Sequence, residues 1–140
     1  MSLPKSLVGA ALSIVLMLVG AFGPWAKVFG ILTINGTDDH KDGWIVVGAA
    51  GVAAVVLLVL TFKPWRWLAF LSLIAGGIAG ATSGYDITDV NGVGGGQVAS
   101  AQWGVYLALA GSILLMLSSI GMFAEVRRPT ADPVAPTEPV

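Results

Sequence analysis

Two apolar stretches joined by a short basic turn constrain the fold of this chain most strongly. The first runs over residues 44–62 and the second over residues 67–83, and neither contains a charged side chain. Each is close to the roughly 20 apolar residues that a helix needs to cross a bilayer. The turn between them carries Lys63 and Arg66. This pattern predicts a helical hairpin through a membrane.

The composition agrees with a membrane protein and excludes several other classes. The chain has 140 residues, of which 56% are hydrophobic and 11% charged, and a soluble domain of this size carries far more charge. A net charge of −1 offers no basic surface for nucleic acid. The absence of cysteine excludes disulfides, thiolate metal sites and cysteine nucleophiles.

Four spans are expected in all. We predict an all-α membrane protein, a bundle of four transmembrane helices over residues 7–22, 44–62, 67–83 and 101–124, with loops at 23–43 and 84–100. Residues 125–140 are polar and proline-rich, which predicts a disordered tail. The first span also has the layout of a secretory signal peptide, but Pro24 directly after Gly23 and three further spans favour a retained helix.

The charges predict the orientation. We expect the protein to lie in the plasma (inner) membrane with both termini in the cytoplasm. In this orientation five of the seven basic residues lie on the cytoplasmic side, and only Lys27 and Lys41 lie outside. The tryptophans fall at the expected boundaries, where their rings would anchor the helices at the interface. These expected interface anchors are Trp25, Trp44, Trp65, Trp67 and Trp103.

The outer loops predict a small extended element. Residues 28–34 favour a strand, and Asn35-Gly36 after them is a strong turn signal. The arm that follows, residues 37–42, has poor strand propensity, so the partner strand is alternatively expected from the second outer loop. Asp42 is the expected N-cap of the second helix.

Small residues predict where helices pack, because in lipid they let backbones approach closely. Helices two, three and four are expected to pack on one another in the outer half of the bilayer. The first helix, with Gly9, Ala10 and Ser13 in its inner half, is expected to pack differently or to face a partner. The expected packing positions are Gly48, Gly51, Gly76, Gly80, Gly104, Ala108 and Gly111.

The residues for chemistry are few. Residues 38–43 overlay the start of a calcium loop, but His40 stands at a ligand position and Ala49 where a glutamate is required, so no EF-hand is expected. A looser cation site remains as an alternative to a solvated turn, and its candidates are Asp38, Asp39, Asp42, Asp86 and Asp89. No nucleophile–base pair can be assembled, so no catalytic residue and no cofactor is predicted.

A set of short motifs resembles a known group of proteins. The set comprises Gly23-Pro24-Trp25, Asn35-Gly36-Thr37-Asp38 with Asp42-Gly43, residues 85–90 and Trp103-Gly104-Val105-Tyr106-Leu107. It is similar to small, mostly uncharacterised four-span membrane proteins of high-GC Gram-positive bacteria. The resemblance covers residues 7–124 and departs from the group's pattern at Gly23 and at residues 38–42. It implies a four-span topology and a bacterial inner-membrane location, and no activity.

The function expected from these features is interaction. The uncharged interior of the spans argues against a pump or coupled carrier. We expect a non-enzymatic accessory or structural subunit of a larger membrane complex, with a membrane-protein partner. The alternative is a homo-oligomeric pore or a protein that handles lipids or small solutes.

Overall fold

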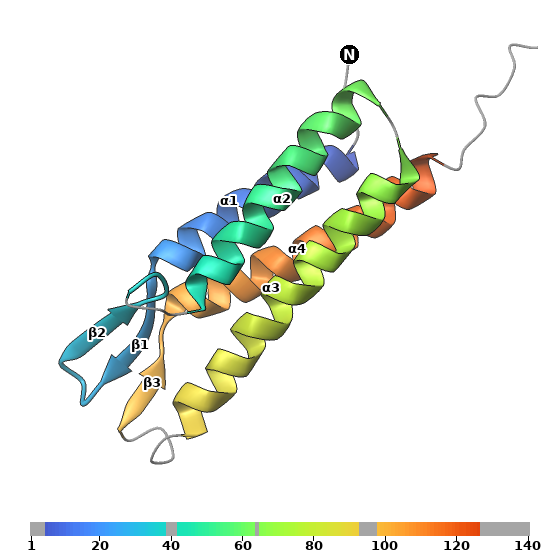
Figure 1. Cartoon of the computed structure of the whole chain (residues 1–140). Coiled ribbons are helices and arrows are strands. Elements are labelled where there is room, and N and C mark those ends of the chain that lie inside the picture. The colour runs from blue at the N-terminus through green and yellow to red at the C-terminus, as the bar shows by residue number, and fades with distance from the viewer. Residues whose placement is uncertain (1–4, 39–41, 64, 93–97, 127–140) are drawn as a thin grey trace, which may run out of the picture.

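The computed structural model describes residues 5–38, 42–63, 65–92 and 98–126, and within them the chain forms four long helices and a small sheet (Figure 1). All four helices are long and apolar enough to cross a membrane, which confirms the expected helical architecture. The helices are α1 (Lys5–Phe22), α2 (Gly43–Phe62), α3 (Arg66–Gly92) and α4 (Trp103–Val126). The strands are β1 (Pro24–Val28), β2 (Leu32–Asn35) and β3 (Ala99–Ala101).

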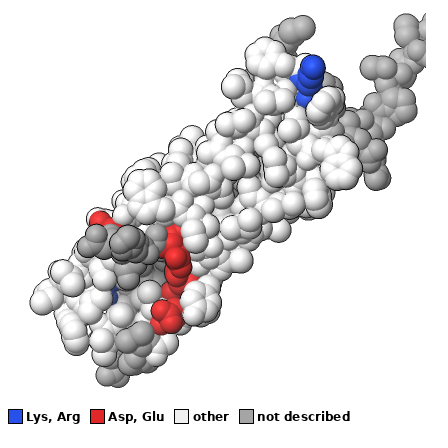
Figure 2. Space-filling view, viewed as in Figure 1, with Lys and Arg blue, Asp and Glu red and all other residues white. Residues whose placement is uncertain are grey.

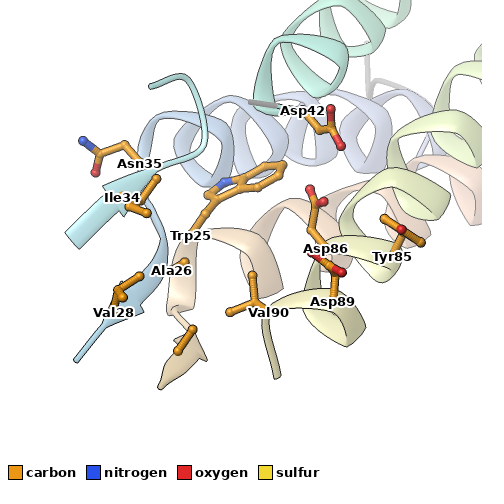
Figure 3. A pocket seen from close by; sticks show the side chains of 11 residues that line it. Trp25, Ala26, Val28, Ile34, Asn35, Asp42, Tyr85, Asp86, Asp89 and Val90 are labelled. Carbon is orange, nitrogen blue, oxygen red and sulfur yellow. The ribbon is translucent and has the colours of Figure 1, made fainter. Parts of the chain in front are cut away.

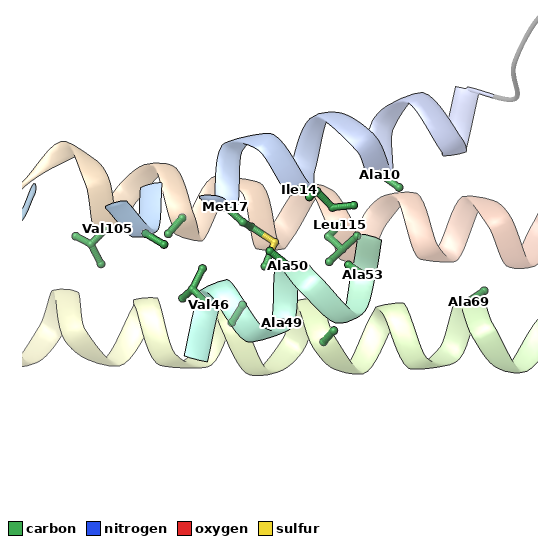
Figure 4. Close-up of a cluster of buried hydrophobic side chains, with 14 of the residues drawn as sticks. Ala10, Ile14, Met17, Val46, Ala49, Ala50, Ala53, Ala69, Val105 and Leu115 are labelled. Atoms are coloured by element: carbon green, nitrogen blue, oxygen red, sulfur yellow. The ribbon is translucent and has the colours of Figure 1, made fainter. Parts of the chain in front are cut away.

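The helices pack as a ring in which each contacts its two neighbours. α1 packs against α4, α4 against α3, α3 against α2, and α2 back against α1. The interior is filled mainly by alanine and serine. The largest fully buried side chains are Met17 and Leu115, which lie in the hydrophobic cluster of Figure 4. The first residue of α1 and the last of α4 lie at the end of the bundle opposite the sheet (Figure 1).

The closest approach in the bundle joins α1 to α4. A Cβ atom built on Gly20 would overlap the backbone nitrogen of Ala108 and stand 2.7 Å from the carbonyl oxygen of Gly104. One built on Gly111 would stand 2.8 Å from the backbone nitrogen of Met17. The first helix is therefore held to α4 by backbone-to-backbone contact near its C-terminal end. We expected the first helix to pack differently from the other three or to face a partner, but it packs closely on α4, as α3 does.

Two further expected positions, both on α3, do pack closely. A Cβ on Gly76 would lie 2.9 Å from the Cγ atom of Met116, and one on Gly80 would lie 3.1 Å from the Oγ atom of Ser112. Both contacts are with α4, so small residues bring α3 and α4 together as expected in a membrane.

Gly48 and Gly51 do not pack within the chain, contrary to expectation. No atom lies within 4 Å of a Cβ built on either residue, and both are exposed on the outward face of α2. α2 instead buries Val46, Ala50 and Ala53, which lie on the opposite face of the helix. The glycines therefore leave an open surface on the bundle.

The sheet joins the two loops at one end of the bundle. β1 is its central strand and pairs antiparallel with β2 and with β3, so the second loop contributes a strand as the sequence suggested. The hairpin turn, however, lies at Phe29 and Gly30, whose φ values of 50° and 71° are those of a type I′ turn. The Asn35-Gly36 pair follows β2 and does not form the hairpin.

α3 is longer than predicted. We expected it to end near Ser83, whereas it continues to Gly92 and leaves a shorter second loop. The added turns pack against β3, and Asn91 Oδ1 accepts a hydrogen bond of 3.2 Å from the backbone N–H of Ala101. α4 likewise begins at Trp103, after β3, and includes residues 125 and 126 of the expected tail; the rest of that tail lies outside the described residues.

Candidate functional site

The end of the bundle that carries the sheet is here called the cap. It consists of β1–β3, the start of α2 and residues 85–92 of α3. Its central side chain is Trp25, which is only 6% exposed and donates its indole N–H to the carbonyl oxygen of Gly20 at 2.9 Å. Trp25 was expected to anchor the chain in the membrane interface. It instead fills the interior of the cap, because its ring packs between the end of α1 and the loop after β2.

Gly36 ties that loop to both neighbouring helices. Its N–H donates to the carbonyl oxygen of Gly23 at 3.2 Å, and its own carbonyl oxygen accepts from the N–H of Gly43 at 3.0 Å. A Cβ on Gly36 would overlap the indole of Trp25 and stand 2.5 Å from the carbonyl oxygen of Ala21. Only glycine fits here, and the start of α2 is thereby fixed beside the end of α1.

A pocket of about 360 Å³ opens between the sheet and the helices of the cap (Figure 3). The sheet supplies an apolar wall, and α2 and α3 supply carboxylates and a phenol. Its lining residues are Trp25, Ala26, Val28, Ile34, Asn35, Asp42, Tyr85, Asp86, Asp89, Val90 and Ala99.

Three of the five aspartates proposed for a cation site line this pocket. Asp42 comes from the start of α2, and Asp86 and Asp89 lie about one turn apart on α3 (Figure 3). Acidic side chains accordingly gather at the cap end of the surface (Figure 2). Among the described residues, however, no group of three His, Cys, Asp or Glu side chains is placed to hold a metal ion.

Of the other two aspartates, Asp38 does not line the pocket. Asp38 Oδ2 accepts a hydrogen bond of 2.7 Å from the backbone N–H of Asn35, which closes the turn after β2. Asp39 and His40 lie outside the described residues. Asp42 occupies the N-cap position of α2 as expected, but its side chain makes no capping hydrogen bond.

Four of the five tryptophans are exposed at helix ends. Trp44, Trp65, Trp67 and Trp103 are between 55% and 80% exposed. Trp44 donates its indole N–H to the carbonyl oxygen of Thr37 at 3.1 Å and packs edge-to-face on Phe22. Their positions suit side chains at a membrane interface, which remains an expectation here.

Sequence reasoning missed the contribution of α3 to the pocket. Residues 85–92 were assigned to a loop because Gly84 and Asn91-Gly92 are turn signals. The spacing of Ile87 and Val90, both partly buried, is that of one helical face, and it was the signal available for a longer helix. No protein-family model, curated protein or solved structure matches the chain, so the proposals below rest on the sequence and this geometry.

Proposed function

We propose that this protein is a non-enzymatic accessory subunit of a larger complex in the plasma membrane, and that it binds its partner through the tip of the β1–β2 hairpin. In this proposal the cap lies on the outer side and both termini lie in the cytoplasm. The distribution of charge supports this orientation, since Lys5 and Lys63 belong to the end opposite the cap and short basic segments favour the cytoplasmic side.

The observation that carries the proposal is an apolar hairpin tip. Phe29, Ile31 and Leu32 are 71%, 87% and 60% exposed. The exposed apolar side chains of the helices would be covered by lipid, but the hairpin extends beyond the ends of α1, α2 and α4 (Figure 1). Five residues of strand from Pro24 reach about 16 Å, which exceeds the roughly 7 Å of headgroup region on each side of a bilayer. Lipid would not cover this tip.

The backbone at the tip adds a second reason. Phe29 has a φ of 50°, a conformation that favours glycine or asparagine and is unfavourable for an aromatic residue. A glycine or asparagine would make the turn at lower cost. A phenyl ring exposed at this turn is explained if it inserts into a partner protein.

The test is co-purification from native membranes in mild detergent, with partners identified and counted. We expect a partner at fixed stoichiometry, and the double substitution Phe29→Asn/Ile31→Asn should weaken its recovery about tenfold or more, because each side chain loses a full apolar burial. Asparagine at position 29 relieves the unfavourable φ, so the variant should fold at least as well as the parent.

The matched control is Thr33→Asn, an exposed polar position on β2 of the same hairpin. It should leave recovery of the partner unchanged. A partner retained by the double variant, or no fixed-ratio partner at all, contradicts the proposal.

A second candidate function, handling of a small solute, is favoured by the cap pocket. Its carboxylates and the Trp25 and Tyr85 rings are groups that bind small organic molecules. The test is thermal unfolding of the protein in detergent with a panel of cationic, neutral and anionic compounds. We expect compounds of only one of these three charge types to raise the midpoint temperature of unfolding. Asp42→Asn/Asp89→Asn should abolish that shift, and Asp38→Asn, outside the pocket lining, should preserve it. A panel without any shift removes this candidate.

A further inference from the structure

An apolar groove runs along the outward face of the bundle between α2 and α3. It consists of two hollows of about 260 and 370 Å³ that share Val52 and Leu71 and are therefore continuous. All of its lining side chains are apolar. They are Ile45, Gly48, Ala49, Gly51, Val52, Val55, Val56 and Val59 of α2 with Leu68, Leu71, Ile74, Ala75 and Ile78 of α3.

Glycine accounts for the depth of the α2 wall. No atom lies within 4 Å of a Cβ atom built on Gly48 or Gly51. The side chain of the neighbouring Val55, by contrast, is 62% exposed and extends outward from α2. In a membrane no water is available to fill such a space. The groove must therefore be filled by something apolar.

The shape of the groove fits an extended chain. From Ile45 to Val59 it follows 15 residues of helix, a rise of about 21 Å, and one leaflet of the hydrocarbon core is about 15 Å thick. It also runs along the spans, which is the direction of lipid acyl chains. A tightly packed partner helix would instead be expected at small residues spaced by four, and the positions four residues after Gly48 and Gly51 are Val52 and Val55.

The two ends of the groove carry opposite charges, and this difference favours a lipid with an anionic headgroup at the basic end. The end lined by Val59 and Leu68 leads into the α2–α3 turn, where the exposed Lys63 stands with its Nζ atom 5.8 Å from the centroid of the Trp65 ring. The sequence places a second cation, Arg66, at the first position of α3. Asp42 precedes α2 at the other end. Basic residues at the ends of membrane helices attract anionic headgroups.

We propose that this groove binds an anionic phospholipid, with one acyl chain between α2 and α3 and its phosphate at Lys63. The glycines of α2 make room for the chain, and the cation at the turn sets the preference for an anionic headgroup. This inference is independent of the partner proposed for the hairpin tip, since the two surfaces share no residue.

The test is native mass spectrometry of the delipidated protein in detergent, titrated with phosphatidylglycerol and phosphatidylcholine of identical acyl chains. The parent protein should prefer phosphatidylglycerol about fivefold, the effect expected of one basic residue near an anionic headgroup. Lys63→Gln should remove most of this preference. Gly51→Leu, which fills the hollow, should lower the occupancy by both lipids.

Matched controls separate the site from general effects. Lys27→Gln changes a cation on β1, away from the groove, and should keep the preference. Gly77→Leu fills another open position on α3 that does not line the groove, and should keep the occupancy. If Gly51→Leu lowers the thermal midpoint, Gly48→Leu probes the other hollow of the same groove.

Four results would overturn the proposal. Equal binding of both lipids by the parent removes the headgroup contact, as does an unchanged preference in Lys63→Gln. Unchanged occupancy in both glycine variants removes the groove. A dimer that Gly51→Leu abolishes while lipid binding persists would assign the groove to a second copy of the chain.

Discussion

Replacing Gly20 by alanine should destabilise the bundle by about 2–3 kcal/mol, the upper part of the range for an overpacked core. The added methyl group meets the backbone of Ala108 and the carbonyl oxygen of Gly104, and neither can move without separating α1 from α4. No flexible side chain is available there to absorb the change.

Gly48→Ala is the matched control for this experiment. It makes the same substitution in α2, where the new methyl group meets nothing within 4 Å, and alanine should raise stability by up to about 1 kcal/mol. Unfolding of both variants in one detergent, followed by circular dichroism, gives the comparison. Equal stabilities would show that the α1–α4 contact is not limiting.

Replacing Trp25 by alanine should cost about 3–5 kcal/mol, as expected for the removal of a buried large aromatic side chain. The variant loses the packing of the indole in the cap and one of the two hydrogen bonds to the carbonyl oxygen of Gly20, which then keeps only the N–H of Gly23 at 3.1 Å among these two donors. The same unfolding assay measures the loss, and binding at the cap pocket should decline with it.

Trp44→Ala separates burial from hydrogen bonding. Trp44 also donates its indole N–H to a backbone carbonyl oxygen, at 3.1 Å, and it stacks edge-to-face on Phe22, but it is 56% exposed. Its loss should cost only about 1–2 kcal/mol from those two contacts. A Trp44 variant as unstable as the Trp25 variant would contradict the assignment of Trp25 as the centre of the cap.

The four long apolar helices could be predicted from the sequence because hydropathy and length indicate them, although the end of α3 could not. The choice of helix neighbours could not. Small residues show where a backbone is able to approach closely but do not name the partner: Gly76 meets α4, Gly104 meets the end of α1 and β1, and Gly48 meets nothing in the chain. That choice depends on the fit of whole helix faces.

The cap was predicted only in outline. The contribution of the second loop to the sheet followed from the sequence. The strand predicted over residues 28–34 was wrong, because the hairpin turn at Phe29 and Gly30 divides that segment between β1 and β2, and an aromatic residue rarely adopts a positive φ. Asn35-Gly36 is a strong turn signal in the sequence, but it forms the turn that leads from β2 to α2 and not the hairpin turn. Of the aspartates proposed for a cation site, Asp42, Asp86 and Asp89 line one pocket and Asp38 does not. Trp25 was misplaced because burial depends on tertiary contacts.

The order of the strands has a consequence for biogenesis. β1 is made early, yet its pairing of Ala26 with Ala101 needs a strand that follows α3 in the chain. If the helices insert into the membrane in chain order, one edge of β1 stays unpaired until α2 and α3 have been inserted. Only then can residues 99–101 reach β1 and pair with it. Such long-range pairing forms late, so the sheet can be completed only after α2 and α3 have brought β3 beside β1.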